Sequence, residues 1–314
     1  MTTSNAAANA SLETAPAGKA WKALSREQQF SMVKRNAERT RGAIAELVER
    51  GALFVVSHSG GKDSQALALF IEANVPAAQI VYVHATLGRF EWDGVIEHIE
   101  GTIAGELELA QAIDKAGNEK SFEDMVLSRR MFPSPKNRQC TSDLKRGPIA
   151  KVIRRLSKET GRKLIVECTG VRADESPQRM RSTVESFAFD KRNSKAGREW
   201  YAMAPIADWT TAEVFAYIAS KGQQPHSAYA AGMSRLSCCF CIMASKADQK
   251  RAAELRPELY AEMVALEQHV DHTMSMTRKP LEQTTGIKAD ADKVRRHLSV
   301  LQAKAPRPCA NAAS

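Results

Sequence analysis

The sequence predicts an α/β fold in which a doubly wound parallel sheet is followed by a C-terminal helical subdomain. Apolar runs of strand length recur at 53–56, 79–84 and 163–169, and segments with helical spacing separate them. Polar, glycine-containing sequence follows the first and last of these runs, where ligands lie in open parallel sheets. The last third of the chain is rich in helix signals and poor in strand signals.

Length and composition are consistent with this architecture. The chain has 314 residues and 43% hydrophobic content, enough for one large α/β domain with a smaller helical appendage. No apolar run approaches the ~20 residues of a membrane span. The N-terminal stretch lacks the basic start and apolar centre of a signal peptide. We therefore expect a cytoplasmic protein with no membrane partner, and disordered tails over residues 1–20 and 303–314.

Taken in order, the chain first predicts one helix over about 25–50, with Ser25 and Gln28 as a capping box and Gly51 as its end. Further elements follow from periodicity and turn residues. We expect strands near 53–56, 79–84, 107–109 and 163–169, and helices near 93–104, 122–131, 149–160 and 210–218. Residues 187–200 predict a mobile loop, and no internal repeat is visible.

The stretch from Ser57 to Ser64 joins the first strand to a helix start. Gly60 and Gly61 let the backbone curl so that several N–H groups point inward, and the helix N-terminus adds positive potential. Lys62 supplies a positive charge. The hydroxyls of Ser57, Ser59 and Ser64 can donate to phosphate or sulfate oxygens. The spacing differs from a Walker A loop. The sequence predicts an anion site here, with an ordinary Gly-Gly turn as the alternative.

Positive charge is concentrated in the middle of the chain. The formal net charge is +9, while residues 129–198 alone carry 19 Lys or Arg and 7 Asp or Glu, so 19 − 7 = +12. A polyanionic partner, either a nucleotide or a nucleic acid, suits such a segment. A solvated basic face without a partner is the alternative.

Three of the six cysteines lie within four positions, which favours metal chemistry over disulfides. Cys238 and Cys241 form a Cys-x-x-Cys pattern with Cys239 inside it, and Cys140 follows a loop on the predicted carboxyl side of the sheet. All-sulfur ligation suits zinc or an iron–sulfur cluster. A redox dithiol and three buried structural thiols remain alternatives. Cys168 lies inside a predicted strand, so we expect it to be a core residue. We expect Cys309, in the tail, to be incidental.

Ser59–Ser64 resembles the PP-loop of the ATP pyrophosphatase superfamily, and the wider pattern resembles the phosphoadenosine-phosphosulfate (PAPS) reductase family. Four further stretches carry the resemblance in the family's order, over roughly residues 50–245. They are Cys140 with Lys145 and Pro148; Gly170–Ser176 with Arg179; Pro205 and Ile206 with Trp209 and Val214; and Tyr229, Gly232, Arg235, Cys238 and Cys241.

The resemblance implies a Rossmann-like adenine nucleotide alpha hydrolase fold, with a PP-loop nucleotide-binding domain over 21–245 and a helical subdomain over 246–302. The loop would hold a pyrophosphate or phosphosulfate group, with Lys62 and Asp63 in catalytic roles and Mg²⁺ assisting. Gly170, Arg172 and Arg179 would complete the nucleotide site. Cys140, Cys238, Cys239 and Cys241 would hold a [4Fe-4S] cluster. Thr141 stands where that branch of the family has the second of a cysteine pair, so the resemblance implies either that Cys239 replaces this ligand or that the cluster has an open iron site.

Three functions are compatible with the resemblance. The first is ATP-dependent adenylylation and sulfur transfer using an iron–sulfur cluster, on DNA or tRNA, with a sulfur donor such as a cysteine desulfurase. The second is a sulfonucleotide reductase that releases sulfite from adenylylsulfate or PAPS. The third is a non-catalytic nucleotide or nucleic-acid binding module. The reductases carry a C-terminal Glu-Cys-Gly motif, whereas this chain has Pro308-Cys309-Ala310, so ATP is the favoured nucleotide.

Overall fold

A six-stranded sheet forms the centre of the nucleotide-loop half of the chain. The structure, a computed structural model, describes residues 12–304. The strand order is β3-β2-β1-β4-β6-β5, in which β1 pairs in parallel with β2 and β4, β4 pairs in parallel with β6, and β5 pairs antiparallel with β6. The strands are β1 (Leu53–Ser57), β2 (Ile80–Ala85), β3 (Leu107–Ala110), β4 (Leu164–Cys168), β5 (Phe187–Phe189) and β6 (Glu199–Met203).

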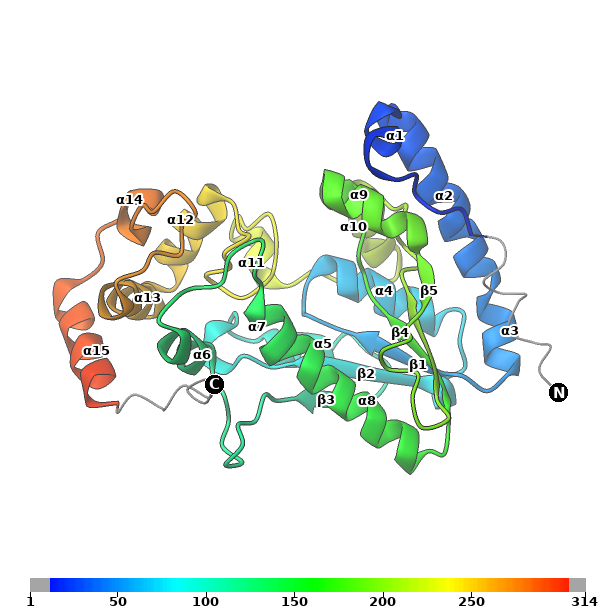
Figure 1. Ribbon diagram of the computed structural model, residues 1–314, viewed down its shortest axis with the longest axis horizontal. Coiled ribbons are helices and arrows are strands. Elements are labelled where there is room, and N and C mark those ends of the chain that lie inside the picture. The colour runs from blue at the N-terminus through cyan, green and yellow to red at the C-terminus, as the bar shows by residue number, and fades with distance from the viewer. Residues whose placement is uncertain (1–11, 305–314) are drawn as a thin grey trace. The chain divides into compact units, whose positions relative to one another are not determined.

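The helices follow the strands in alternation over the first two thirds of the chain and dominate the last third (Figure 1). The longer ones are α2 (Arg26–Gly42), α4 (Lys62–Glu72), α6 (Phe122–Arg129), α8 (Gly147–Glu159), α10 (Thr211–Ser220), α12 (Lys246–Leu255), α13 (Pro257–Val270) and α15 (Ala291–Ala303). The shorter ones are α1 (Gly18–Ala23), α3 (Ile44–Glu49), α5 (Val95–Glu100), α7 (Gln139–Thr141), α9 (Pro177–Ser182), α11 (Ser227–Ala230) and α14 (Leu281–Thr285). This is the predicted doubly wound α/β fold.

The chain divides into two compact units that are not contiguous in sequence. Among the described residues, the first takes in 12–84, 96–109 and 150–226. The second takes in 85–95, 110–149 and 227–304. The second unit therefore combines part of the predicted nucleotide-binding domain with the predicted helical subdomain. None of the helices in the described part of the chain has both the length and the apolar character required to cross a membrane.

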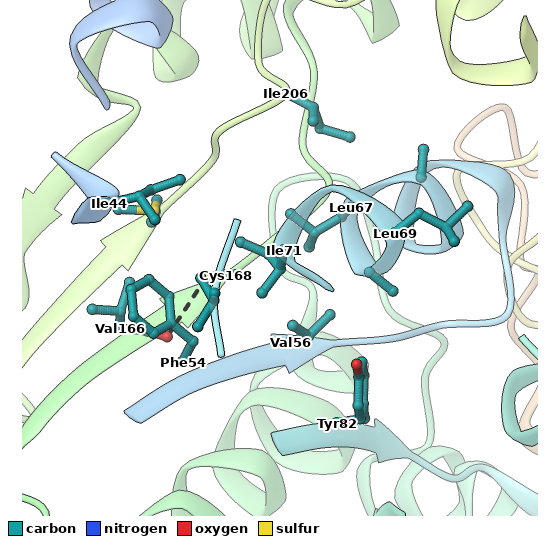
Figure 2. Packing of buried hydrophobic residues seen from close by; sticks show 14 of the residues in the cluster. Ile44, Phe54, Val56, Leu67, Leu69, Ile71, Tyr82, Val166, Cys168 and Ile206 are labelled. Atoms are coloured by element: carbon teal, nitrogen blue, oxygen red, sulfur yellow. Dashed lines mark hydrogen bonds between the residues drawn. The ribbon is translucent and has the colours of Figure 1, made fainter. Parts of the chain in front are cut away.

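The core of the first unit lies between β1 and α4. Phe54 and Val56 of β1 are fully buried, as are Leu67 and Ile71, which project from α4 towards them (Figure 2). Because β1 is covered on both faces, its sequence is a continuous apolar run rather than an alternating one. Replacing Leu67 with alanine would cost ~2–5 kcal/mol of stability. Cys168 is fully buried here, as the sequence predicts, and burial raises the pKa of its thiol.

Two sequence predictions need correction in this unit. Residues 187–200 form a hairpin of β5 and β6 rather than a mobile loop, because Phe187 packs against Tyr201 with ring centroids 5.0 Å apart. Order also begins before residue 20. The backbone N–H of Glu13 donates to Asn36 Oδ1 at 3.0 Å, and the Glu13 carboxylate binds Arg35. Predictions for residues 1–11 and 305–314, including Cys309, lie outside the described residues.

Helix caps explain where several helices begin. Ser25 and Thr210 each form the predicted capping box, with Gln28 and Glu213 respectively. The first predicted helix is divided at Ala43 into α2 and α3. In the second unit, α13 is the central helix and packs against α6, α12, α14 and α15.

Candidate nucleotide site and thiol group

The loop between β1 and α4 lies at the point where the strand order reverses. β2, the next strand in the sequence, pairs with β1 on one side, and β4 pairs with β1 on the other side. Ligands in open α/β sheets bind at this switch point, outside the carboxyl ends of the strands. Val56 pairs in register with Cys168, so β1 and β4 end side by side and their following loops are neighbours.

Hydrogen bonds inside the loop hold its turn. The Ser64 hydroxyl donates to the Gly61 carbonyl at 2.9 Å and accepts from the Ser59 backbone N–H at 3.1 Å. Gly60 adopts a φ of +75°, a conformation that glycine reaches without a steric cost. Its N–H donates to Nδ1 of His58 at 3.0 Å. Ser64 therefore shapes the loop from within, while Ser57 keeps a buried hydroxyl that has no hydrogen-bond partner among the described residues.

His58 connects the loop to the sheet. Its backbone N–H donates to the Val83 carbonyl at 2.9 Å, and its carbonyl is 2.9 Å from Nδ1 of His84. The ring is buried, and burial, reinforced by His84 and His98, lowers its pKa to about 3. A neutral ring is required here, because Nδ1 can accept the Gly60 N–H only when it carries no proton.

The N-terminus of α4 has the features of an anion site. Gly61 is the N-cap residue of the eleven-residue helix, and it has no side chain that could accept from the first N–H groups of the helix. These donors and the helix dipole both favour negative charge. Gly170, after β4, lies against the same turn, and a Cβ at this position would be 2.5 Å from the Asp63 carbonyl oxygen. Only glycine fits this approach.

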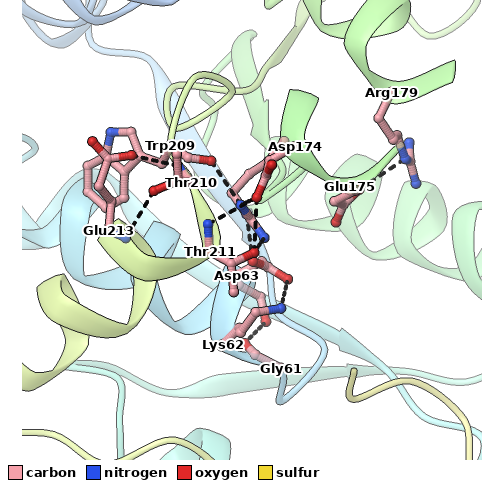
Figure 3. Close-up of polar contacts among 12 residues, drawn as sticks. Gly61, Lys62, Asp63, Asp174, Glu175, Arg179, Trp209, Thr210, Thr211 and Glu213 are labelled. Atoms are coloured by element: carbon pink, nitrogen blue, oxygen red, sulfur yellow. Dashed lines mark hydrogen bonds and ion pairs between the residues drawn. The ribbon is translucent and has the colours of Figure 1, made fainter. Parts of the chain in front are cut away.

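Asp63 sits between two cations. Its Oδ1 accepts from Nε of Arg172 at 2.7 Å, and its Oδ2 is 3.0 Å from Nζ of Lys62 (Figure 3). The Arg172 side chain is 2% exposed and Lys62 is buried as well. Such close pairing offsets the large cost of removing these charges from water.

The two terminal nitrogens of Arg172 also donate to the protein. They reach the Trp209 carbonyl at 2.8 Å and the Thr211 hydroxyl at 3.2 Å. Asp174 lies 3.6 Å from the same guanidinium and accepts from Thr211. Burial opposes ionisation of Asp174, but the Thr211 hydrogen bonds and the Arg172 charge lower its pKa overall. Arg172 therefore fastens β4's loop to α4 and α10.

Arg179 lies apart from this network. It belongs to α9, its side chain is 36% exposed, and it pairs with Glu175 at 3.2 Å (Figure 3). Of the residues predicted to surround the anion, the structure thus brings together the Ser57–Ser64 loop, Gly170 and Arg172. The role of Arg179 in substrate binding stays a prediction.

Three of the four predicted metal ligands gather in the second unit. The Cys238 and Cys241 thiols hydrogen-bond to each other, which lowers the pKa of Cys241 to about 5, and Cys140 interacts electrostatically with both thiols. Cys238 and Cys241 come from the Cys-x-x-Cys segment, while Cys140 belongs to α7. Proximity of residues about a hundred positions apart follows from the fold.

Cys239 faces a different environment. It is 2% exposed, its N–H donates to the Phe90 carbonyl at 2.9 Å, and its Sγ is 3.7 Å from the Arg256 guanidinium. Burial raises its pKa to about 12. Within residues 12–304, no three His, Cys, Asp or Glu side chains are arranged to hold a metal ion. The four-cysteine ligand set therefore stays a prediction.

Sequence reasoning missed three contributors to the loop's geometry: His58, Asp174 and Thr211. His58 directly precedes the glycine-rich turn, so its position was a usable signal. Thr211 follows the predicted N-cap Thr210, but no sequence signal indicates its contact with Arg172, because the two residues are 39 positions apart.

The whole arrangement can be compared with known proteins. The model of the phosphoadenosine phosphosulfate reductase domain matches residues 53–244, which is more than half of the chain. The chain belongs to this family. The PAPS reductase family is a nucleotide-utilising branch of the PP-loop superfamily. We call Ser59–Ser64, the stretch that resembles the superfamily's loop, the PP-loop.

Curated relatives are also similar to the chain. It is 31% identical over 149 residues to an uncharacterized 37.8 kDa protein of Escherichia phage 186, covering 48% of this chain and 43% of that protein. It is 25% identical over 208 residues to an uncharacterized protein of Methanocaldococcus jannaschii, covering 66% of this chain and 46% of the relative. The chain thus spans less than half the length of these relatives.

Among solved structures, the chain is similar to phosphoadenylyl-sulfate reductase from Candida auris, at 15% identity and a TM-score of 0.40, covering 69% of this chain and 96% of that one. Candida glabrata FMN adenylyltransferase matches at 15% identity and a TM-score of 0.40, covering 69% and 67%.

Proposed function

We propose that this chain is an ATP-using enzyme that adenylylates an acceptor at the PP-loop, releases pyrophosphate and transfers sulfur through its thiol group. The observation that carries the proposal is the uncapped N-terminus of α4 at the sheet's switch point, with Lys62 beside it and Gly170 against its backbone. An acceptor oxygen would attack the α-phosphorus of ATP, and the bond to the pyrophosphate oxygen would break. Sulfur at the oxidation level of sulfide would then displace AMP, which leaves with the acceptor's oxygen.

The roles of the charged residues follow from their contacts. Lys62 would stabilise the negative charge that develops on the departing pyrophosphate. Asp63 would hold Lys62 in place while Arg172 holds Asp63. Arg172 is thereby a positioning residue in this proposal, since its guanidinium already contacts Asp63, Trp209 and Thr211.

The residues present do not fit a Mg²⁺ ion held by Asp63. Both carboxylate oxygens already bind cations, Oδ1 the Arg172 guanidinium and Oδ2 the Lys62 ammonium. Mg²⁺ commonly reaches such enzymes on the substrate's phosphates. We derive no step through the metal.

Cys140, Cys238 and Cys241 offer the donor chemistry that a thiophilic group requires, and their thiols would have to move closer together to hold one, because no three His, Cys, Asp or Glu side chains of residues 12–304 are arranged around a metal position. Three sulfur donors suit an iron–sulfur cluster or zinc, and we propose a [4Fe-4S] cluster held by these three residues. Such a group, when bound, would carry sulfur chemistry at an iron without a protein ligand. The environment of Cys239, packed against Arg256 and Phe90, supports leaving it out of the ligand set.

The acceptor in this proposal is a nucleic acid, DNA or tRNA, and the sulfur comes from a donor protein such as a cysteine desulfurase. The net charge of residues 129–198 supports a polyanionic partner. Part of that charge is already engaged, since Arg129 binds Asp143 and Arg155 binds Glu108.

ATP–pyrophosphate exchange tests the proposal. Purified protein is incubated with ATP and labelled pyrophosphate, with and without DNA or tRNA. We expect exchange that depends on Lys62 and disappears in Lys62→Met, while the exposed lysine variant Lys158→Met keeps it. Absence of exchange under every condition would contradict the proposal. Tight ATP binding without exchange would favour a non-catalytic binding module.

The family match favours one other candidate, a sulfonucleotide reductase. That enzyme would release sulfite from adenylylsulfate or PAPS, with a thiol as nucleophile. A sulfite assay with both nucleotides and a thiol reductant separates the two reactions. Sulfite release without pyrophosphate exchange would replace the adenylylation proposal.

A further inference from the structure

The second unit contains a cavity of about 790 Å³ whose lining includes Gln139, the residue before Cys140. One wall is the segment 131–139, which leads directly into Cys140. The other walls are the C-terminal half of α13 and the segment 271–282 that follows it. This volume lies within the range of small-molecule binding sites. Gln139 lines the cavity and is covalently adjacent to Cys140, so an occupant would lie close to that thiol.

Direct contacts hold the cavity walls together. The Glu267 carboxylate, buried on α13, accepts from the Met274 and Leu281 N–H groups at 2.8 Å each. The Phe132 N–H donates to Nδ1 of His272 at 3.3 Å, and the two rings stack with centroids 6.3 Å apart. Segments 131–139 and 271–282 are therefore fixed to each other and to α13, which gives a largely preformed site.

Apolar side chains and amides share the lining. Met131 and Met276 are 42% and 63% exposed, unusual for large apolar residues, and thioethers pack well against aromatic rings. Gln139 is 8% exposed, and its side-chain amide makes no hydrogen bond to any described residue. Asn137 and Gln268 add two further amides. Each amide offers a donor and an acceptor.

The Gln139 amide can reach water while the cavity is empty, because neither of its polar atoms is among the fully buried atoms without a hydrogen-bond partner, and an occupant would displace that water. Leaving such a group without a hydrogen bond costs ~1–3 kcal/mol, so a purely apolar occupant would be disfavoured. A planar heteroaromatic ring with donors and acceptors on its edge satisfies both features of the lining. Amide side chains pair with base edges, and carboxylates such as Asp271 accept from amino groups.

Charge around the cavity suits a phosphate outside it. Arg278 lines the cavity, and Lys136, Arg138 and Lys279 flank lining residues in sequence. Within the described part of the chain, none of these four cations forms an ion pair. Two carboxylates of the lining already have partners. Glu267 accepts from backbone N–H groups, and Glu282 binds Lys288 and the Ala289 N–H.

We propose that this cavity binds a single nucleobase, carried either by a free nucleotide or by an unpaired residue of a nucleic acid strand. The base contacts Met131, Met276 and the amide of Gln139, and the phosphate lies near Arg278. The cavity is separate from the PP-loop, which takes the ATP. Binding of a nucleobase in this cavity requires no turnover and does not depend on the proposed function. Only the further statement that the bound nucleotide accepts the sulfur rests on the proposed function.

Binding of short labelled oligonucleotides to the full-length protein tests the inference by fluorescence anisotropy. The probes are hexamers of abasic sites that carry one central thymine, cytosine, adenine or guanine, and a fully abasic hexamer of equal charge. The 5′-monophosphates of all four nucleosides serve as competitors. We expect at least one base to tighten binding about tenfold or more over the abasic probe, as good base-edge contacts do.

Two variants assign the effect to the cavity. Gln139→Leu removes the amide, and Met276→Asp places a charge on an exposed wall residue without disturbing the core. Both should bring the single-base probes to within about twofold of the abasic probe, since the base-edge contacts are lost. Gln302→Leu, an exposed glutamine on α15, should leave the preference unchanged.

The outcomes separate this inference from the proposed function. Lys62→Met should abolish pyrophosphate exchange and keep the base preference, whereas Gln139→Leu should keep exchange measured with ATP alone. Competition by monophosphates would identify a free nucleotide as the source, and its absence would identify a strand. Equal binding of abasic and base-bearing probes, or a base preference that both cavity variants retain, would overturn the inference.

Discussion

In the first unit, the polar groups of the PP-loop bond to one another; in the second, the amide of Gln139 faces a cavity with no protein partner. The Ser59, Gly61 and Ser64 groups are mutually hydrogen-bonded, and Asp63 is bracketed by two cations. A satisfied network of this kind holds its shape before a ligand arrives. The difference teaches that the loop has its shape before any ligand binds, as the proposed anion cradle requires, while the amides of the cavity would form hydrogen bonds to an occupant in place of water.

The largest expected effect is on the cradle, from Gly170→Val. The added side chain would meet the Asp63 carbonyl at 2.5 Å, so the loop backbone must shift and pyrophosphate exchange should be lost. Over-packing of this kind costs ~1–3 kcal/mol of stability. Gly42→Ala is the matched control, because nothing lies within 4 Å of a Cβ there. Retained exchange in Gly170→Val would show that the close approach is unimportant.

The next largest effect is expected on metal binding by Cys140, Cys238 and Cys241, in contrast to Cys239. If three cysteines hold a metal or cluster, Cys140→Ser, Cys238→Ser and Cys241→Ser should each lose most of the bound metal. Cys239→Ser should keep it, since its Sγ lies beside Arg256. Metal analysis and visible absorption of anaerobically purified protein measure this. Equal loss in Cys239→Ser would restore the four-cysteine ligand set.

Breaking the ion pair of Arg172 tests how far the cradle depends on charge. Asp63→Ala leaves a buried guanidinium with Asp174 as its remaining carboxylate, at 3.6 Å. We expect a loss of about 3 kcal/mol in the free energy of unfolding, the lower end for a broken buried pair. Denaturant titration of Asp63→Ala, Arg172→Met and the double variant gives the coupling energy. Independent, additive effects would mean that the pair contributes little.

A pH titration gives the most graded effect, because it spreads over several pH units. Burial lowers the pKa of His58 to about 3 and that of His98 to about 4, the latter aided by His226. Between these values and ~6.5 the unfolded chain binds more protons, so stability is complete above pH ~6.5 and falls as the pH drops. Each group contributes a slope of up to ~1.4 kcal/mol per pH unit.

His58→Asn isolates the contribution of one of these rings. An asparagine oxygen can accept the Gly60 N–H as Nδ1 does, and it does not titrate. The denaturation midpoint of His58→Asn should therefore fall less steeply between pH 6.5 and pH 4 than that of the unaltered protein. Parallel pH profiles for the two proteins would remove His58 from the acid response.

Much of the first unit could be predicted from local sequence. The β1 run, the two glycines, Lys62 and the caps at Ser25 and Thr210 are contiguous signals, and each became the expected element. The hairpin of β5 and β6 was missed, because its polar connection resembles a loop and its pairing with β4 is not local. The sequence placed Arg172 beside the loop, but it did not predict the hydrogen bonds that Arg172 donates to Asp63 and Thr211.

The sequence by itself determined the family, the α/β architecture and the presence of an anion loop, because strand, turn and helix signals act over short distances. The tertiary structure decided which side chains meet. It separated Cys239 from the other thiols, enclosed Arg172 among protein acceptors, and built a cavity from segments more than a hundred residues apart. Such contacts depend on how elements pack, and packing is a property of the whole chain rather than of any one segment.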